Sequence, residues 1–308
     1  MLKSNGGGAL LRSAGSALAA AVLLMAGSGA AAAKLDPNKP VDALKINQKA
    51  ICSLNDGETV LYWWKGAMFS RVEGEKDREL FKLQGMNIRQ CQNLKDPKRG
   101  AGFKSVSREV MLYLDPATEQ VVDKWKNPWT GEELEVLHVA NDPVNMRNPM
   151  FAYTADGKPM KAEFTVMNGR AFKGGNAPLF YKNPLQGEYQ DWVGGSYHAM
   201  EMGNDFFYAD DLFDGSKPTV KHHSISWSRI SGWLPWMKMG DRNGVVYTAT
   251  VGGRVKSLDE LPEPLKSTLR QRYPQYAAPP PLNDTRPNET SWEVFRKLME
   301  QRAKEKSK

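Results

Sequence analysis

The chain has 308 residues, of which 41% are hydrophobic and 25% are charged, and this composition excludes a disordered chain, a collagen and a bundle of membrane helices. Its formal net charge is +7, but six basic residues against two acidic ones lie in the tail from Arg296 to Lys308. Two further basic residues, Lys3 and Arg12, lie near the N-terminus. The rest is nearly neutral and lacks the basic face that nucleic acids require, so we expect no nucleic-acid partner.

Residues 1–33 have the pattern of a secretory signal peptide. Lys3 and Arg12 precede an apolar run from Ser16 to Met25, and small residues at 27–33 offer a cleavage site. The run is shorter than the roughly 20 apolar residues that span a bilayer, which makes a retained anchor helix the weaker alternative. We therefore expect residues 34–308 to form a single domain in the periplasm or outside the cell, without stable membrane insertion. A single Arg12 favours the general secretion route over the twin-arginine one.

The chain contains two cysteines, Cys52 and Cys91. Export brings them into an oxidising compartment, where paired thiols tend to form a disulfide. They flank a hairpin that we expect from Val60–Val72 and Leu80–Gln90, and both lie near its open end. This placement is compatible with a Cys52–Cys91 bridge, and two buried free thiols are the alternative. Two cysteines without a nearby histidine cannot form a usual four-ligand zinc site.

Apolar and polar residues alternate with a period of two through most of the chain after residue 58, which predicts β-strands. Turn sequences such as Asp115–Thr118 separate them. Nine or ten strands at hairpin spacing, without intervening helices, predict a mainly β fold in which an antiparallel meander closes into a barrel or sandwich. We expect Lys173–Asn176 and Val193–Ser196 to be loops, because neither glycine pair follows a strand and opens a helix as in a nucleotide-binding motif. The further strands are expected at Val110–Leu114, Gln120–Lys126, Glu133–Ala140, Met150–Thr154, Met160–Met167, Tyr197–Tyr208, Thr219–Ile230 and Gly244–Val251.

Two helices are predicted near the C-terminus, over residues 258–273 and 290–305. Ser257 and Glu260 have the spacing of a capping box, and leucines recur on one face after them. A proline-rich strap follows, and Thr290 and Glu293 predict a second capped helix. We expect both helices to pack on the β-sheet rather than to form a second domain.

Four histidines are candidates for acid–base chemistry, because histidine titrates near neutral pH. Neighbouring strand residues point to opposite faces, so only one of His222 and His223 can face an interior. His222 shares a face with serines, whereas His223 shares one with Trp227 and Arg229, and either set could line a pocket. A purely structural role for these histidines is the alternative.

For catalysis, we predict His138 or His222 as the acid or base, with Asp142 or Asp241 as the orienting carboxylate. A metal site formed by His138, His198 and one of the His222–His223 pair is the alternative, but no local metal-binding signature supports it, so we expect no cofactor. The mature chain contains no Gly-x-Ser-x-Gly motif and no papain-like cysteine context, which argues against a hydrolase with a Ser or Cys nucleophile.

The segment Ser226–Arg242 is rich in Trp, Met and Arg, which suit the binding of a flat apolar molecule over a barrel mouth. The alternative is a Trp-rich plug that closes the barrel end as core. The predicted substrate-binding residues are Asn141, Tyr197, His198, Trp227, Arg229, Trp233, Trp236 and Met239.

Several motifs together resemble the exported bacterial proteins of the domain of unknown function 1838 family. They are Asn127–Glu132, His138–Val144, Ser226–Arg242, and Pro279–Pro281 followed by Asn288–Trp292. The resemblance covers nearly the whole mature chain and implies a calycin-like barrel. Better-known barrels of that kind hold terpenoid, carotenoid or fatty-acid derivatives, but the resemblance implies no particular reaction.

Two functions therefore follow as hypotheses. The first is a cofactor-independent lyase, isomerase or hydratase that acts on an apolar, ring-bearing molecule of aromatic, terpenoid or steroid-like type. The second is a non-catalytic periplasmic carrier or scavenger of a hydrophobic ligand. Buried charged groups in the cavity favour the enzyme, and a wholly apolar cavity favours the carrier.

Overall fold

The computed structural model of the chain describes residues 34–181 and 197–307. The predicted signal peptide and the predicted Val193–Ser196 loop lie outside these residues. Contacts within Ala32–Lys308 group this part of the chain as one unit. No helix in the described ranges is both long and apolar enough to cross a membrane.

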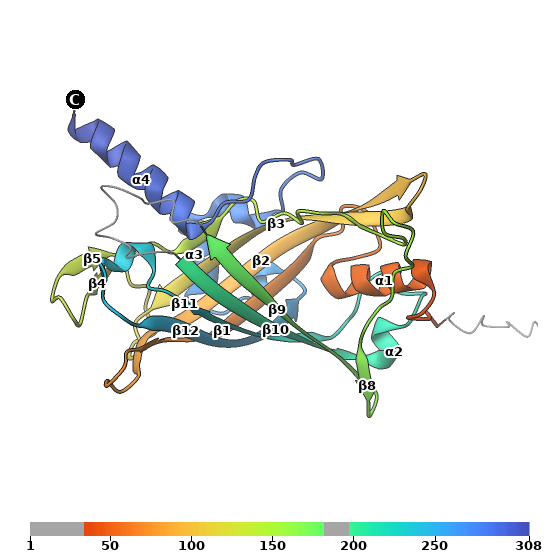
Figure 1. The fold of residues 1–308 in the computed structure, drawn as a ribbon, viewed down its shortest axis with the longest axis horizontal. Coiled ribbons are helices and arrows are strands. Elements are labelled where there is room, and N and C mark those ends of the chain that lie inside the picture. The colour runs from red at the N-terminus through yellow and green to blue at the C-terminus, as the bar shows by residue number, and fades with distance from the viewer. Residues whose placement is uncertain (1–33, 182–196, 308) are drawn as a thin grey trace, which may run out of the picture. The chain divides into compact units, whose positions relative to one another are not determined.

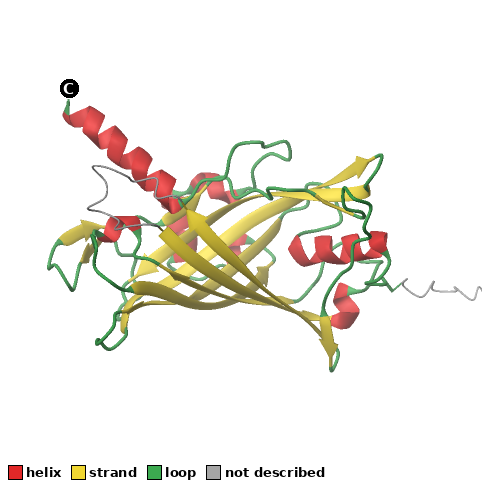
Figure 2. Cartoon of the chain, viewed as in Figure 1, coloured by secondary structure: helices red, strands yellow, loops and turns green. Residues whose placement is uncertain are grey.

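A single antiparallel sheet forms most of the structure (Figures 1 and 2). It confirms the mainly β, antiparallel prediction, and the first hairpin is β1 paired with β2. The β2–β3 ladder is the longest and joins Lys82–Asp96 to Gly100–Leu114. The seven long strands, in spatial order, are β3 (Gly100–Leu114), β2 (Arg78–Asp96), β1 (Val60–Arg71), β12 (Val245–Val255), β11 (His223–Ser231), β10 (Tyr197–Tyr208) and β9 (Arg170–Tyr181).

Short strands lie at both ends of this sheet. β6 (Val139–Asn141) and β7 (Met150–Phe151) pair with β3, and β8 (Thr165–Met167) pairs with β9. In the described part of the chain no ladder joins β6 or β7 to β8, so the sheet is open and the predicted closure into a barrel is not found. The end strands have only two or three residues each, too few to build a continuous ladder between the two edges.

Several predictions of strands and loops need correction. The predicted strands Gln120–Lys126 and Met160–Met167 are strands only over Lys124–Lys126 and Thr165–Met167. The predicted loop Lys173–Asn176 lies inside β9, where Gly174 and Gly175 continue the ladder with β10. The predicted strand Glu133–Ala140 is divided into β5 (Glu133–Glu135) and β6, and β5 pairs with β4 (Lys124–Lys126) in a separate two-stranded sheet. β9 also contains Pro178, which is tolerated because β8 pairs only with its first residues and leaves the rest as an edge.

The helices match the predictions in part. α4 (Ser291–Lys306) begins with the predicted capping box between Thr290 and Glu293. The other C-terminal helix is shorter than predicted: a 3-10 turn, η3 (Leu258–Glu260), is followed by α3 (Leu265–Arg272), because two prolines lie between them and interrupt the helix. The structure adds α1 (Pro40–Ile51) and the short α2 (Ala209–Leu212), neither of which was predicted.

A disulfide joins Cys52, at the C-terminal end of α1, to Cys91 in β2, with a Cα–Cα distance of 6.1 Å. Both side chains are fully buried. The bridge closes the chain segment that contains β1 and most of β2, and it fixes the end of α1 against the sheet.

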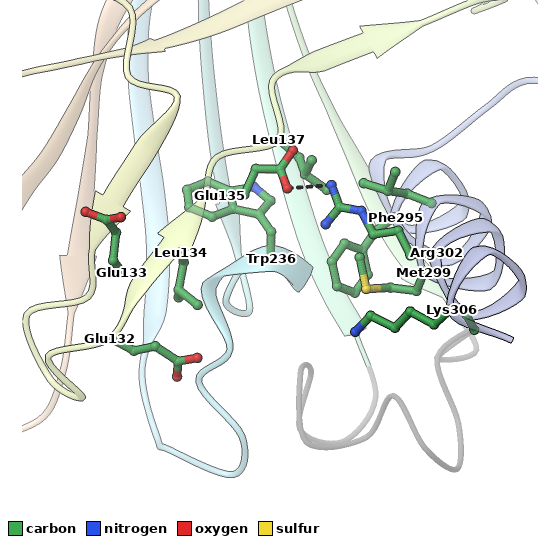
Figure 3. A pocket seen from close by; sticks show the side chains of 12 residues that line it. Glu132, Glu133, Leu134, Glu135, Leu137, Trp236, Phe295, Met299, Arg302 and Lys306 are labelled. Carbon is green, nitrogen blue, oxygen red and sulfur yellow. Dashed lines mark hydrogen bonds and ion pairs between the residues drawn. The ribbon is translucent and has the colours of Figure 1, made fainter. Parts of the chain in front are cut away.

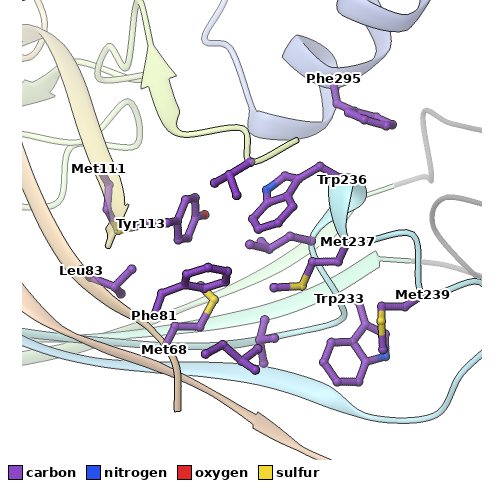
Figure 4. Close-up of a cluster of buried hydrophobic side chains, with 14 of the residues drawn as sticks. Met68, Phe81, Leu83, Met111, Tyr113, Trp233, Trp236, Met237, Met239 and Phe295 are labelled. Atoms are coloured by element: carbon purple, nitrogen blue, oxygen red, sulfur yellow. The ribbon is translucent and has the colours of Figure 1, made fainter. Parts of the chain in front are cut away.

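The segment 233–239 forms a plug of buried side chains at one end of the sheet (Figure 4). It contains η2 (Pro235–Met237). The Trp236 ring lies 5.5 Å from the Tyr113 ring and 5.8 Å from that of Phe81, and Phe295 of α4 packs in the same cluster. Trp233, Trp236 and Met239 are only 7%, 3% and 6% exposed, so they do not line an open mouth as predicted. They belong to the core, as the alternative of a Trp-rich plug had it.

The turn at Asn127–Glu132 holds this plug in place. The buried Asn127 side chain donates from Nδ2 to the Met237 carbonyl at 3.0 Å, and its Oδ1 accepts from the Trp129 backbone N–H at 2.9 Å. Glu132 forms an ion pair with Lys238 at 2.6 Å. Two of the motifs in the sequence thus form one structural unit.

We predict that the Cys52–Cys91 bridge resists alkylation. Denatured, non-reduced protein should carry no label on either cysteine, and reduced protein should carry two. Replacing both cysteines by serine should lower the free energy of unfolding by about 4 kcal/mol, because the bridge closes a loop of 39 residues. Two labels without reduction would show free thiols.

We predict that Trp236→Ala lowers the free energy of unfolding by about 3–5 kcal/mol, as expected for a large aromatic residue removed from a packed core. Urea denaturation measures this loss. Tyr153→Ala serves as the control, because Tyr153 is 38% exposed and its truncation should cost less than about 1 kcal/mol. A Trp236 variant as stable as the wild type would place Trp236 outside the core.

Candidate functional site

A cavity of about 390 Å³ opens on the inward face of the sheet, and we call it the concave pocket. Side chains from β1, β2, β3 and β6 meet side chains from β9, β10 and β11 around it, so the sheet curls strongly even though its end strands are not paired. Leu234 of the plug forms part of one wall. The residues that line it are Trp64, Asn87, Arg89, Glu109, Met111, Val139, Asn141, Val144, Arg147, Leu179, Glu201, Ile225, Trp227, Arg229, Leu234 and residues 288–291.

The register of the strands places the polar residues of the concave pocket close together. Asn87 of β2 lies opposite Glu109 of β3, and Glu109 lies opposite Asn141 of β6. On the other side, Glu201 of β10 lies opposite Arg229 of β11, and the two form an ion pair at 3.3 Å. Residues opposite each other in antiparallel strands share one face of a sheet, so these polar groups all point into the pocket.

Glu109 is the most perturbed acid of the pocket. Burial raises the pKa of its carboxyl group, although a hydrogen bond from Asn141 Nδ2 at 2.8 Å and the positive charges of Arg89 and Arg229 act in the opposite direction. Glu201 contributes to the rise through like-charge repulsion. Such a carboxyl group keeps its proton more readily than a carboxyl group in water, and a group of this kind can donate or accept a proton in a reaction.

Aromatic and aliphatic side chains form the walls. Trp64 and Trp227 line the concave pocket, and Trp64 lies over Gly85, where any Cβ would overlap its ring. Trp64 Nε1 and Asn141 Oδ1 are buried and have no hydrogen-bond partner within the described residues. A buried donor and a buried acceptor without partners are uncommon in native proteins, so these two atoms require an explanation.

A second cavity of about 250 Å³, which we call the α1 compartment, shares Trp64, Asn87, Arg89 and Ile225 with the concave pocket. Asn47, Ala50 and Ile51 of α1 close it at the end of the sheet opposite the plug. His223 Nε2 lies 2.7 Å from Asp205 Oδ1 within it, and the His223 ring stacks on Phe207 at 4.1 Å. Burial lowers the pKa of His223 despite the nearby Asp205, and this shift favours the neutral imidazole.

A groove of about 460 Å³ between α4 and the β5 region is larger but less suited to chemistry (Figure 3). Its charged side chains lie on the rims, where Arg302 forms an ion pair with Glu135 at 2.5 Å. These side chains are 42% and 53% exposed, so water screens their interaction. The concave pocket is therefore the candidate functional site.

Three of the predicted substrate-binding residues, Asn141, Trp227 and Arg229, line the concave pocket together. The backbone of Tyr197 begins β10, but its side chain lies outside what the structure describes. His198 is exposed on β10.

The predicted catalytic residues lie away from the concave pocket. The His138 side chain is buried against the Tyr113 ring, and its Nδ1 accepts from the Tyr113 backbone N–H at 3.1 Å. Asp142 forms ion pairs with Arg108 at 2.9 Å and with Arg286 at 2.7 Å. His222 and Asp241 are exposed. Strand alternation turns His223, and not His222, toward the interior.

Sequence reasoning missed several residues that the structure brings to the site. Trp64, Arg89, Glu109, Glu201 and Asp205 were not singled out. The sequence contained two signals that could have identified them. One is the strand His223–Ser231, in which His223, Trp227 and Arg229 share a face. The other signal is a charged residue in the middle of a predicted strand, as Arg89 is in β2 and Glu109 is in β3. Across residues 34–181 and 197–307 no group of three His, Cys, Asp or Glu side chains is arranged to hold a metal ion.

The fold and the site define an antiparallel β protein whose main sheet curls around a pocket with aromatic walls and charged side chains. Comparison with protein families gives a match over residues 57–299 to the family described as "Protein of unknown function (DUF1838)", and the chain belongs to this family. The family assignment confirms what the sequence motifs indicated. No curated protein matches the chain.

We predict that the buried His138 lowers the free energy of unfolding as the solution becomes acidic. Burial lowers the pKa of His138 from 6.5 to about 4 in the folded protein, although Asp123 lies 3.7 Å from its Nε2. The unfolded chain then binds more protons between these values, so the stabilisation is complete above pH 6.5 and is lost as the pH falls toward 4. The difference corresponds to about 3 kcal/mol.

Urea denaturation between pH 4 and pH 7.5 measures this effect. His138→Gln should flatten the pH dependence of the free energy of unfolding, whereas His222→Gln, at an exposed position, should leave it as in the wild type. If the free energy of unfolding depends on pH as steeply in His138→Gln as in the wild type, His138 is not the cause of the loss of stability in acid.

Proposed function

We propose that the concave pocket binds a small, ring-bearing apolar molecule and that the protein is a cofactor-independent lyase, isomerase or hydratase. Glu109 is the proposed acid or base. This assignment replaces His138 and His222, because neither of them lines the concave pocket. The walls formed by Trp64 and Trp227 suit a flat ring system, since aromatic side chains offer large contact areas with few rotatable bonds.

One observation carries the proposal: a buried carboxyl group with a raised pKa lies on the wall of a cavity whose other walls are aromatic. A group of this kind is typical of active sites, where burial tunes acids and bases toward neutral pH. Asn141 holds one oxygen of Glu109 in place through its hydrogen bond at 2.8 Å. The other oxygen is thereby available to a ligand in the pocket.

The buried charges also bear on the alternative function, a periplasmic carrier or scavenger. A carrier of an apolar molecule needs a cavity with few polar groups. The concave pocket instead contains Arg89, Glu109, Glu201 and Arg229, and removing such charges even partly from water costs stability that an apolar lining would not. This cost supports a role of these charged residues in catalysis rather than in the passive binding of an apolar ligand.

The proposed location is the periplasm or the exterior of the cell. The signal-peptide pattern of residues 1–33 and the Cys52–Cys91 bridge both support it, since disulfides persist in oxidising compartments. Sequencing of the mature N-terminus from a periplasmic fraction tests the proposal, with Lys34 as the expected first residue. An intact Met1 in a membrane fraction would contradict it.

The ligand can be sought directly on the purified protein. Organic extraction followed by mass spectrometry should identify a ring-bearing compound that remains bound through purification. The same compound, added back to ligand-free protein, should quench tryptophan fluorescence, because Trp64 and Trp227 line the concave pocket. Absence of any ring-bearing compound that binds would contradict the proposed function.

We predict that Glu109→Gln lowers the turnover of that compound by about 10²- to 10⁴-fold, the usual contribution of a general acid or base. Its affinity should stay within about tenfold of the wild type, because glutamine keeps the shape and the hydrogen bond to Asn141. Glu163→Gln, at an exposed position outside the pocket, is the matched control and should keep full activity. If the wild type binds the compound but does not change it, the carrier function stands instead.

A further inference from the structure

Arg89 is a cation whose side chain lines both cavities. Its Nε donates to Asn87 Oδ1 at 2.8 Å, and its guanidinium group lies 4.6 Å from the centre of the Tyr62 ring. Among residues 34–181 and 197–307 no Asp or Glu forms an ion pair with it, whereas Arg229 in the same pocket is paired with Glu201. An enclosed charge is costly unless it is paired, so Arg89 requires an explanation.

The surroundings of Arg89 add positive charge. Arg254 lies against the same Tyr62 ring at 5.1 Å. Lys173 lines the α1 compartment, and its Nζ donates to the neutral Asn47 Oδ1 at 3.0 Å. Asp205 is the only carboxylate among the described residues that line this compartment, and its Oδ1 is already engaged by His223. The α1 compartment therefore has an excess of positive charge.

The neighbouring acids do not balance this charge. Glu109 and Asp205 attract Arg89 only at longer range, and burial is the largest influence on it, lowering its pKa. Burial also favours the protonated form of Glu109, which weakens its attraction for Arg89. The guanidinium group thus belongs to a side chain that lines both cavities and forms no ion pair with any described Asp or Glu.

We propose that Arg89 binds a carboxylate group of the ligand, so that the substrate class is a ring-bearing carboxylate rather than a neutral hydrocarbon. The inference rests on the proposed function, because the rings are the part that Trp64 and Trp227 contact. Arg89 and Trp64 line both cavities, so one ligand can place its rings in the concave pocket and its carboxylate toward the α1 compartment. A guanidinium group suits this task because its N–H groups match the two oxygens of a carboxylate.

The test compares 2-naphthoate with its methyl ester, which has the same rings but no charge. Isothermal titration calorimetry with the full chain should show that the wild type binds 2-naphthoate at least about tenfold more tightly than methyl 2-naphthoate, the lower end expected for a charge-assisted contact. Arg89→Met should remove this preference and leave the affinity for the ester within about threefold. Arg89→Lys should keep part of the preference, because it keeps the charge but not the planar group.

Arg242→Met is the matched control, since it removes one positive charge at an exposed position outside both cavities. It should bind both compounds as the wild type does. The melting temperature of ligand-free Arg89→Met should equal or exceed that of the wild type, because an unbalanced interior charge has been replaced by an apolar side chain of similar length.

The possible results separate the two proposals. Equal affinity of the wild type for 2-naphthoate and the ester would overturn the carboxylate inference and leave the binding of rings intact. A preference for 2-naphthoate that persists in Arg89→Met would also overturn it. If neither compound binds, the proposed ring-binding function fails, and the inference that rests on it fails too.

Discussion

The candidate site depends on the register of the ladder between β2 and β3. This ladder places Asn87 opposite Glu109, and the short ladder to β6 then places Asn141 beside Glu109. Side chains alternate between the two faces of a strand, so a slip of one residue would turn Glu109 outward and bring Arg108 or Val110 into its place. Fifteen residue pairs fix this register, and the Cys52–Cys91 bridge ties β2 to α1 beside it. The longest ladder of the sheet therefore carries Arg89 and Glu109, the charged side chains that are costly to remove from water.

An open sheet can enclose such a pocket only if other elements cover its ends. The plug at 233–239 does so at one end with tightly packed aromatic side chains, and α1 does so at the other. The plug is held by Asn127, whose buried amide binds the Met237 carbonyl, so the Trp-rich segment and the Asn127–Glu132 turn act together. Leu234 is the only residue of the plug on the wall of the concave pocket among the described residues. Its tryptophans serve stability, and the tryptophans that face the pocket come from β1 and β11.

Much of this fold could be predicted from the sequence, because apolar and polar residues alternate regularly within its strands. The first hairpin and the strand Tyr197–Tyr208 follow from that pattern, and the capping box at Thr290 marks the start of α4. The missed elements lack such signals. α1 begins at Pro40 without a side-chain cap, and β9 contains Gly174, Gly175 and Pro178, which are typical of loops. In the site, Asn141, Trp227 and Arg229 were found because they lie in distinctive motifs. Arg89 and Glu109 meet only through the pairing of β2 with β3, which local patterns do not specify.

The two proposed roles in the pocket are physically coupled. The positive charge of Arg89 favours the ionised form of Glu109, while burial disfavours it. An anion bound to Arg89 would offset that positive charge, and the balance at Glu109 would shift further toward the protonated acid. Binding of a carboxylate ligand would then place a proton on the group that faces the rings of the same ligand. The positive charge of Arg89 and the carboxyl group of Glu109, each costly to remove from water by itself, thus fit one proposed mechanism, in which the charge of a bound carboxylate favours the protonated form of the proposed acid Glu109.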